Sequence, residues 1–106
     1  MIYGNIIGDL QIKTTTKNEI GETIENWVSK YSIKGFIDLI SGSSNYLNFN
    51  SKLQESTHVF ICDYLHLSSI KATDARMMIN SKIYDVLLID DPMELHQHIE
   101  IYLKYI

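Results

Sequence analysis

The stretch TDARMMINSKIYDVLLIDDP, from Thr73 to Pro92, is the most informative part of this chain for its fold. Thr73 and Asp74 are residues that cap helices, and we expect them to begin one helical turn that runs through Met78. Asn80 and Ser81 then predict a tight turn. The apolar run from Lys82 to Ile89 predicts a strand, which ends at an acidic pair and the only proline.

The rest of the chain outside this stretch also shows the periodicity of strands. Before it, alternating or continuous apolar residues predict four strands, at Ile6 to Thr16, Glu22 to Tyr31, Ile33 to Ile40 and His58 to His66. After it, the pattern predicts a last strand from Leu95 to Ile106, and a hairpin turn is expected around Gly21. About six strands with short turns predict an all-β fold, a small antiparallel β-barrel or sandwich with one short helical turn.

One connection stands out from the short turns. From Ser41 to Thr57 the chain is rich in serine and asparagine and has no period, which predicts a long loop. The loop carries Gly42 and four isolated apolar or aromatic residues, Tyr46, Leu47, Phe49 and Leu53. Such residues favour a functional loop that a partner or a neighbouring subunit covers, and a solvated loop with incidental aromatics is the alternative.

Composition limits the classes of protein to which the chain can belong. A length of 106 residues predicts one domain, 1–106, with a thin stability margin that oligomerisation could increase. The net charge is −4, and the lysines and the arginine are isolated from one another in the sequence, so no basic cluster is present that would bind phosphates. The lone Cys62 predicts a small buried hydrophobe in a reducing compartment. No run reaches the ~18 apolar residues of a membrane span, so we expect an intracellular protein with no membrane partner.

The last predicted strand carries the residues that most resemble a metal site. His96, His98 and Glu100 alternate at period two and are expected on one side of that strand. A metal site also needs ligands from a neighbouring strand, and His58 and His66 have no recognisable ligand spacing. We therefore expect a polar or interfacial face, with no metal and no cofactor. No phosphate-binding loop or nucleophile motif occurs in the sequence, so we expect no enzyme.

The order of five segments resembles a known family. They are GETIENW, KGFIDLIS, HVFICDY, ARMMINSKIYDVLLIDDP and IEIYLKYI. In this order, over nearly the whole chain, they resemble the head–tail joining proteins of long-tailed bacteriophages, the head-completion or stopper group. The family pattern of an arginine, alternating apolar residues, a turn and Lys-x-Tyr is present at Arg76, Met77, Ile79, Ser81, Lys82, Tyr84 and Val86. Ser81 stands where a turn glycine is common, so Asn80 is expected to take the left-handed conformation.

The resemblance implies a structural virion protein that acts at the head–tail connector. It implies a homo-oligomeric ring, twelvefold, below the portal and adaptor, assembled in the host cytoplasm from subunits that are monomers in solution. The loop from Ser41 to Thr57 would close the DNA channel after packaging, with DNA passing through without specific binding. Another surface would attach the tail terminator or tail tube. A tail-completion or terminator ring, a small β-barrel metal-binding enzyme and a peptide- or sugar-binding barrel are the alternatives.

The same resemblance assigns roles to particular residues. Tyr46, Leu47, Phe49 and Leu53 would make loop-to-loop contacts around the ring, with Gly42 as a hinge. Subunit contacts would use sheet edges and the polar face of the last strand, with His96, His98 and Glu100 as its interface residues.

Overall fold

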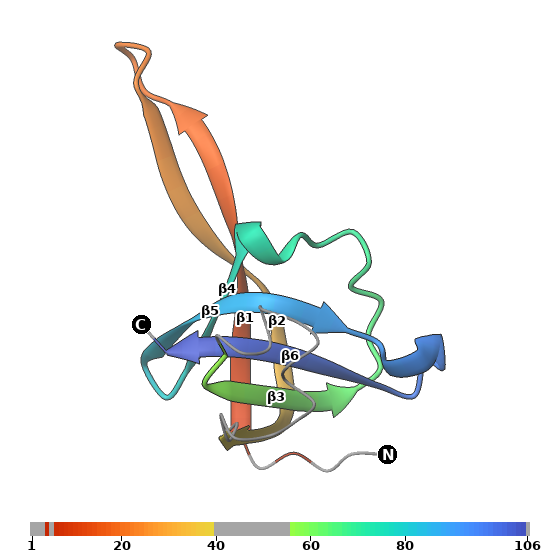
Figure 1. Cartoon of the computed structure of the whole chain (residues 1–106). Coiled ribbons are helices and arrows are strands. Elements are labelled where there is room, and N and C mark those ends of the chain that lie inside the picture. The colour runs from red at the N-terminus through yellow and green to blue at the C-terminus, as the bar shows by residue number, and fades with distance from the viewer. Residues whose placement is uncertain (1–3, 5, 40–55, 106) are drawn as a thin grey trace.

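The fold is a closed antiparallel barrel of six strands. The computed structural model describes residue 4 and residues 6–39 and 56–105. The strands are β1 (Ile6–Lys17), β2 (Thr23–Leu39), β3 (His58–Asp63), β4 (Ala75–Ile79), β5 (Lys82–Asp90) and β6 (His98–Tyr105). They close in the order β1-β2-β3-β6-β5-β4 (Figure 1). Two 3₁₀ turns, η2 (Ala72–Asp74) and η3 (Pro92–Glu94), are the helical elements of the described residues. This confirms the predicted all-β class and its barrel form.

The prediction of separate second and third strands was wrong, because both belong to the single strand β2. Ser32 lies within this strand, opposite Asp9 of β1, and does not end it. The pairing with β1 shifts by one residue between Leu10 and Gln11, so Lys30 forms a bulge. A bulge increases local twist and bend without ending a strand. The two predicted strands are therefore continuous through the bend.

The predicted helical turn through Met78 was also wrong. The 3₁₀ turn ends at Asp74, and the next five residues form β4. Burial alternates along β4, with Ala75, Met77 and Ile79 inside and Arg76 and Met78 only half-buried. This strand pairs with β1 on one side and β5 on the other. Two-sided pairing therefore outweighs the local preference for a helical turn.

The turn between β4 and β5 has the geometry that makes tight hairpins. Ile79 pairs with Lys82, so Asn80 and Ser81 form a two-residue loop. Both residues have positive φ angles, 50° and 65°. The left-handed conformation expected of Asn80 is confirmed, and Ser81 shares it. Two successive residues of positive φ match the right-handed twist of a hairpin, as in a type I′ turn.

The barrel interior is a continuous apolar core. Side chains from all six strands meet there, and the largest fully buried ones are Phe60, Leu10, Met77, Ile101, Leu103 and Cys62. Burial, with a further contribution from Asp63, raises the pKa of the Cys62 thiol to about 11. The thiol is therefore protonated at neutral pH and buried, as the sequence predicted for its packing. No helix in the described part of the chain is long and apolar enough to span a membrane.

Two predicted strand ends shift in the structure. The strand β3 ends at Asp63 and not at His66, and only its inward side chains Phe60 and Cys62 are fully buried. The last strand begins at His98 and not at Leu95, because η3 and the bend after it precede β6. The loop from Ser41 to Thr57 lies largely outside the described residues. The described residues nearest to it on either side that belong to strands, Leu39 and His58, pair with each other.

Candidate assembly surfaces

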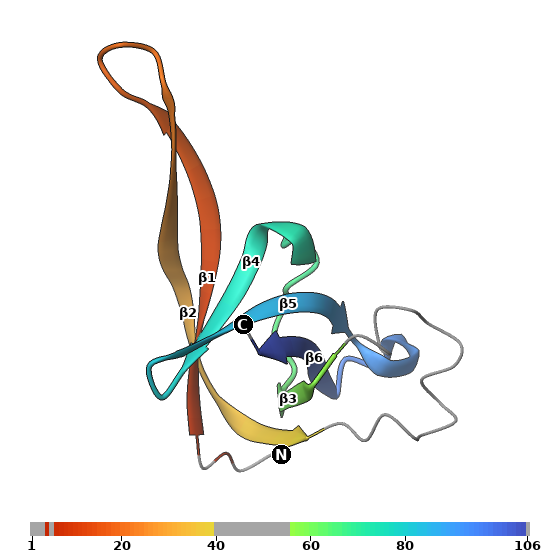
Figure 2. The same ribbon diagram turned by 60° about the vertical axis from the view of Figure 1, so that its left-hand side comes forward.

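A two-stranded hairpin projects beyond the barrel. The strand β4 pairs with β1 only at Gly8–Ile12, and β3 pairs with β2 only at Gly35–Leu39. Beyond Ile12 the strands β1 and β2 continue to pair with each other as far as Lys17 and Thr23. We call residues 13–28 the arm. The arm gives the molecule its length, about 50 Å against 29 and 27 Å in the other directions (Figures 1 and 2).

The tip of the arm is closed by an asparagine. The Asn18 side-chain oxygen accepts hydrogen bonds from the backbone N–H groups of Ile20 (3.1 Å) and Glu22 (2.8 Å). Gly21 has a φ of 82°, and a Cβ added there would meet no atom within 4 Å. Asparagine and glycine supply the side-chain acceptor and the positive φ that such a turn needs. The predicted hairpin turn around Gly21 is confirmed.

One face of the arm exposes two branched aliphatic side chains, and a third is exposed in the turn at its tip. Val28 is 51% exposed, Ile24 is 41% exposed and Ile20 at the tip is 77% exposed. Val28 pairs with Ile12, whose side chain packs against the barrel core, so this face continues the inner face of the barrel. Within the described residues, no other strand covers this face once the barrel has ended. These side chains are therefore available to a partner.

The opposite face of the arm is fixed to the barrel at its base. The Arg76 guanidinium lies 4.5 Å from the centre of the Trp27 ring, and its Nε donates to Gln11 Oε1 at 2.6 Å. The structure places Trp27 on the outer face of the arm with Lys13 and Glu25. A stacked, hydrogen-bonded arginine restrains the ring, so the arm leaves the barrel in a defined direction.

The outer face of β6 carries a row of polar side chains. Glu100 accepts a hydrogen bond from the Tyr102 hydroxyl at 2.7 Å, and its other oxygen lies 3.1 Å from His98 Nε2. Asp90 of β5 pairs directly with Glu100. Burial raises the pKa of the Asp90 carboxyl, and the negative charges of Glu100 and Asp91 raise it further against the opposing effect of His98. Two carboxylates therefore face each other across the strands, an arrangement that destabilises a sheet.

Replacing Asp90 by asparagine is expected to raise the melting temperature at pH 7 by a few degrees. The raised pKa means that the folded state keeps a proton at a pH where the unfolded state has lost it. Stability therefore falls as pH rises through the folded pKa of Asp90, and the charge costs stability at neutral pH. Thermal unfolding of both proteins across acid and neutral pH measures the difference. The difference in melting temperature between the two proteins should vanish at pH values below the ordinary pKa of aspartate.

A matched control for this substitution is Asp85→Asn in the same strand. Asp85 pairs with Arg76 and Lys104, so removing its charge should lower stability slightly. A lower melting temperature for Asp90→Asn at pH 7, or a difference that persists unchanged in acid, would contradict the repulsion.

The structure separates His96 from the other two residues of the predicted polar group. His96 lies in the bend before β6 with a φ of 56°. Its backbone N–H donates to Asp91 at 3.1 Å, its ring contacts the other Asp91 oxygen, and its ring centre lies 4.8 Å from that of Tyr64. His98 and Glu100 instead contact each other on β6. The expectation that all three share one side of a strand was wrong, because the strand begins only at His98.

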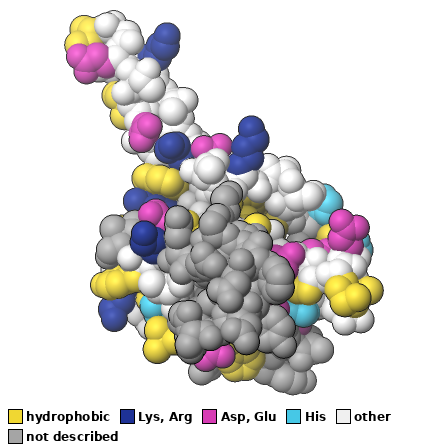
Figure 3. Space-filling view, in the orientation of Figure 1, with side chains coloured by type: hydrophobic (Ala, Val, Ile, Leu, Met, Phe, Trp, Pro, Cys, Tyr) yellow, Lys and Arg dark blue, Asp and Glu magenta, His cyan; other side chains and the backbone are white. Residues whose placement is uncertain are grey.

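Two further predictions concern a metal site and the residues of the long loop. Across the described residues, no group of three His, Cys, Asp or Glu side chains is placed to hold a metal ion. The predicted loop residues lie outside the described residues, namely Gly42, Tyr46, Leu47, Phe49 and Leu53. On the face shown in Figure 3, cationic and acidic side chains are interspersed.

Neither the arm nor the facing carboxylates of Asp90 and Glu100 were predicted from the sequence. One signal for the arm was present, because apolar residues on the inner face of β1 stop at Ile12 while the strand pattern continues to Lys17. A strand that continues after its inner face has ceased to be apolar extends beyond the hydrophobic core. The facing of Asp90 and Glu100 carried no sequence signal, since it depends on the register between two strands.

The fold is shared with proteins of known structure. A protein from Shigella flexneri 2a, whose solution structure is known, superposes with a TM-score of 0.75 at 16% identity, over 97% of this chain and 93% of that one. A chain of the virion of a native gene transfer agent particle superposes with a TM-score of 0.60 at 13% identity, over 93% of this chain and 91% of that one. No curated protein matches the sequence significantly.

A family model for phage head completion proteins matches residues 8–104. The match runs from the first barrel strand through the arm, β3, β4 and β5 and into the end of β6. Because it covers far more than half of the chain, this protein belongs to the phage head completion protein family.

Proposed function

We propose that this protein forms a homo-oligomeric ring at the head–tail connector, below the portal and its adaptor. In this proposal the ring closes the DNA channel after packaging and offers the surface to which the tail attaches. The observation that carries it is the head completion family match over residues 8–104. That match supports a structural, non-enzymatic role in the virion. The fold shared with a chain of a gene transfer agent virion agrees with this role.

The charge of the chain supports a channel through which DNA passes without being held. The net charge is −4, and the nine cationic residues are spread along the sequence. Binding to DNA gains its affinity from lysine and arginine contacts with phosphates. A ring of such subunits therefore obstructs DNA mechanically, and it lets DNA leave when the obstruction moves.

The proposed channel-closing element is the loop from Ser41 to Thr57. Leu39 and His58, which flank it, are paired neighbours in the barrel wall, so the loop leaves and re-enters the barrel at one place. This supports an insertion that can change its contacts without disturbing strand pairing. In the proposal, Tyr46, Leu47, Phe49 and Leu53 make loop-to-loop contacts, and Gly42 acts as a hinge. His98 and Glu100 of β6, with the nearby His96, belong to the subunit contacts.

Electron microscopy of phage particles with altered protein tests this function. Particles that lack the protein are expected to leak DNA or to lack tails. Particles in which Ser43 to Ser56 is replaced by a short Gly-Ser linker are expected to carry docked rings that leak. A second variant keeps the loop length and replaces only Tyr46, Leu47, Phe49 and Leu53 by serine. Because the proposal assigns the closure to these side chains, its particles should leak DNA as those of the linker variant do.

The outcomes separate the two parts of the proposal. If heads without the protein retain DNA and join tails normally, the head-completion role is wrong. If rings with the Gly-Ser linker retain DNA, the ring role stands and another element closes the channel.

A further inference from the structure

The arm has two free strand edges of opposite charge. Along its β1 edge, from Lys13 to Lys17, the sequence KTTTK carries two positive charges. Along its β2 edge, from Thr23 to Val28, the only charged residue is Glu25, and Glu22 precedes it in the turn. In the described chain no strand pairs with β1 beyond Ile12 on its outer side, or with β2 before Gly35. Each edge therefore offers unpaired backbone donors and acceptors.

These edges lack most of the features that prevent pairing with another chain. Proteins protect exposed edges with charged side chains, especially lysine, and with prolines, bulges or short strands. Of these features, the β1 edge has Lys13 and Lys17. The only proline of the chain is Pro92, and the register shifts of the described strands, at Lys30 and Leu87, lie outside the arm. Three consecutive threonines, β-branched residues that favour strands, occupy the β1 edge. The arm is thus suited to accept a further strand.

A third strand would also stabilise the arm. An isolated two-stranded hairpin is marginally stable in water. Val28 and Ile24 remain exposed on one face and Ile20 remains exposed at the tip, and Lys13 makes only a long ion pair with Glu25, at 3.9 Å. Adjacent strands in a sheet lie ~4.8 Å apart, so side chains on a joined arm would contact these aliphatic residues. The added contacts would shield apolar surface that the barrel leaves uncovered.

We propose that the arms of neighbouring copies of this protein join edge to edge in one antiparallel sheet. The β1 edge of one copy, Lys13 to Lys17, pairs with the β2 edge of the next, Thr23 to Val28. When these ranges pair with Lys13 opposite Trp27 and Lys17 opposite Thr23, Glu25 of the neighbour lies opposite Thr15 and diagonal to both lysines, within reach of their long side chains. This inference deepens the proposed ring and rests on it, because the arms meet only where copies stand side by side.

The direction of the strands is compatible with a ring. The strands β1 and β2 are antiparallel within one arm. When two arms point the same way, β1 of one copy is therefore antiparallel to β2 of the next. The contact uses a different edge on each copy, and each copy still has a free edge for a further neighbour. Such head-to-tail contacts generate closed rings when the rotation between copies closes.

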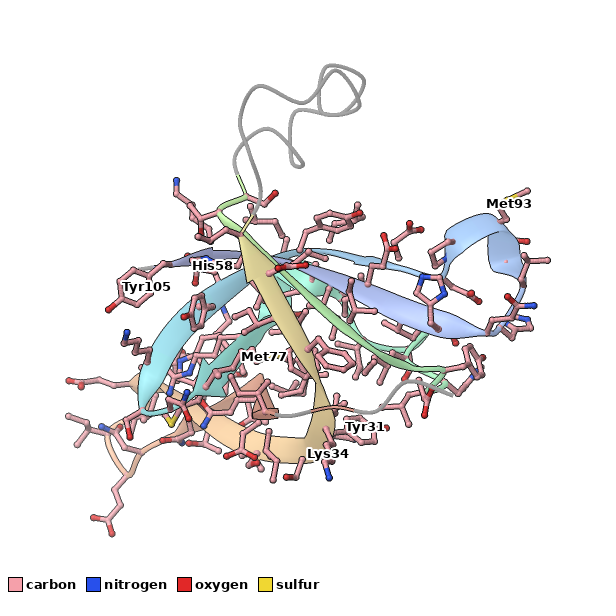
Figure 4. All side chains as sticks on the ribbon, turned by 90° about the horizontal axis from the view of Figure 1, so that it is seen from below. Tyr31, Lys34, His58, Met77, Met93 and Tyr105 are labelled. Carbon is pink, nitrogen blue, oxygen red and sulfur yellow. The ribbon has the colours of Figure 1, made fainter. Side chains whose placement is uncertain are left out.

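Cysteine cross-linking within assembled particles tests the proposed sheet. One variant carries Thr15→Cys on β1, the other carries Thr23→Cys on β2, and the two are co-assembled and treated with a short bismaleimide. A Thr15–Thr23 product between copies is expected only in the mixture. The native Cys62 is buried, with a pKa raised to about 11, so the unsubstituted protein serves as the background. Met93→Cys is the matched control, because Met93 is highly exposed at the distant η3 turn (Figure 4).

Each outcome decides the proposal. Products between two Thr15→Cys copies would indicate a symmetric contact. Products with another virion protein would indicate that this protein binds the edge of the arm. Either result overturns the inference. Absence of the product in particles whose rings are visible by electron microscopy overturns it and leaves the ring intact. Absence of rings refutes the proposed function, and the arm contact with it.

Charge reversal provides a second, independent measurement. Replacing Lys13 and Lys17 by glutamate is expected to reduce the cross-link yield several-fold, because the facing edges then repel. Adding Glu22→Lys and Glu25→Lys to the same chain should restore the yield. If the yield stays low, or if the first change has no effect, the charge complementarity of the edges is wrong.

Discussion

Replacing Phe60 by alanine is expected to lower the free energy of unfolding by about 3–5 kcal/mol. Phe60 is 0% exposed and lies in the apolar core inside the barrel. Truncation removes the transfer free energy of the ring and leaves a cavity that a closed sheet cannot easily collapse to fill. Since a domain of this size is stable by only about 5–15 kcal/mol, the variant should be partly unfolded at moderate temperature.

Phe36→Ala in β2 is the matched control for this change. Phe36 pairs with Ile61 on the outside of the barrel and is 40% exposed, so the same truncation should cost about 1 kcal/mol or less. Urea unfolding of the three proteins measures the difference, with similar denaturant slopes expected. Equal losses for Phe36→Ala and Phe60→Ala would show that the barrel interior is not the main source of stability.

Gly35→Ala is expected to destabilise the protein by about 3 kcal/mol or more, at the upper end of the usual cost of overpacking. A Cβ at this position would lie 2.4 Å from the backbone oxygen of Ile61 and 2.9 Å from the Phe60 ring. The backbone of β3 cannot move away without breaking the pairing of Gly35 with Cys62. The barrel therefore needs glycine here because two strands and an aromatic ring meet closely.

The control for Gly35 is the other glycine of the barrel wall, Gly8. A Cβ at Gly8 would lie 2.8 Å from the sulfur of Met77, the flexible end of a side chain. Methionine adapts its rotamers readily, so Gly8→Ala should cost about 1 kcal/mol. Thermal unfolding should show a shift of about 4–8 °C per kcal/mol. A larger shift for Gly8→Ala than for Gly35→Ala would contradict the distinction between backbone and side-chain contacts.

The candidate surfaces were only partly predictable. The prediction that His98 and Glu100 share one side of the last strand was correct, because side chains of one strand alternate whatever its neighbours are. The position of His96 was not, because positive φ angles at Met93, Glu94 and His96 bend the chain before β6. The only local signal for the arm is that the inner apolar face of β1 stops at Ile12, since the start of a projecting hairpin is set by where its neighbours β4 and β3 stop pairing.

The sequence by itself determined the all-β class, the tight turn at Asn80-Ser81, the turn around Gly21 and the burial of Cys62. These features depend on residues adjacent in the chain, through alternation, β-branching and the turn preferences of asparagine and glycine. Only the tertiary structure decided that two predicted strands are one, that β4 is a strand, and that β1 and β2 extend into an arm. The physical reason is that hydrogen bonds between strands distant in sequence set the length and register of each strand, and these pairings outweigh local preferences.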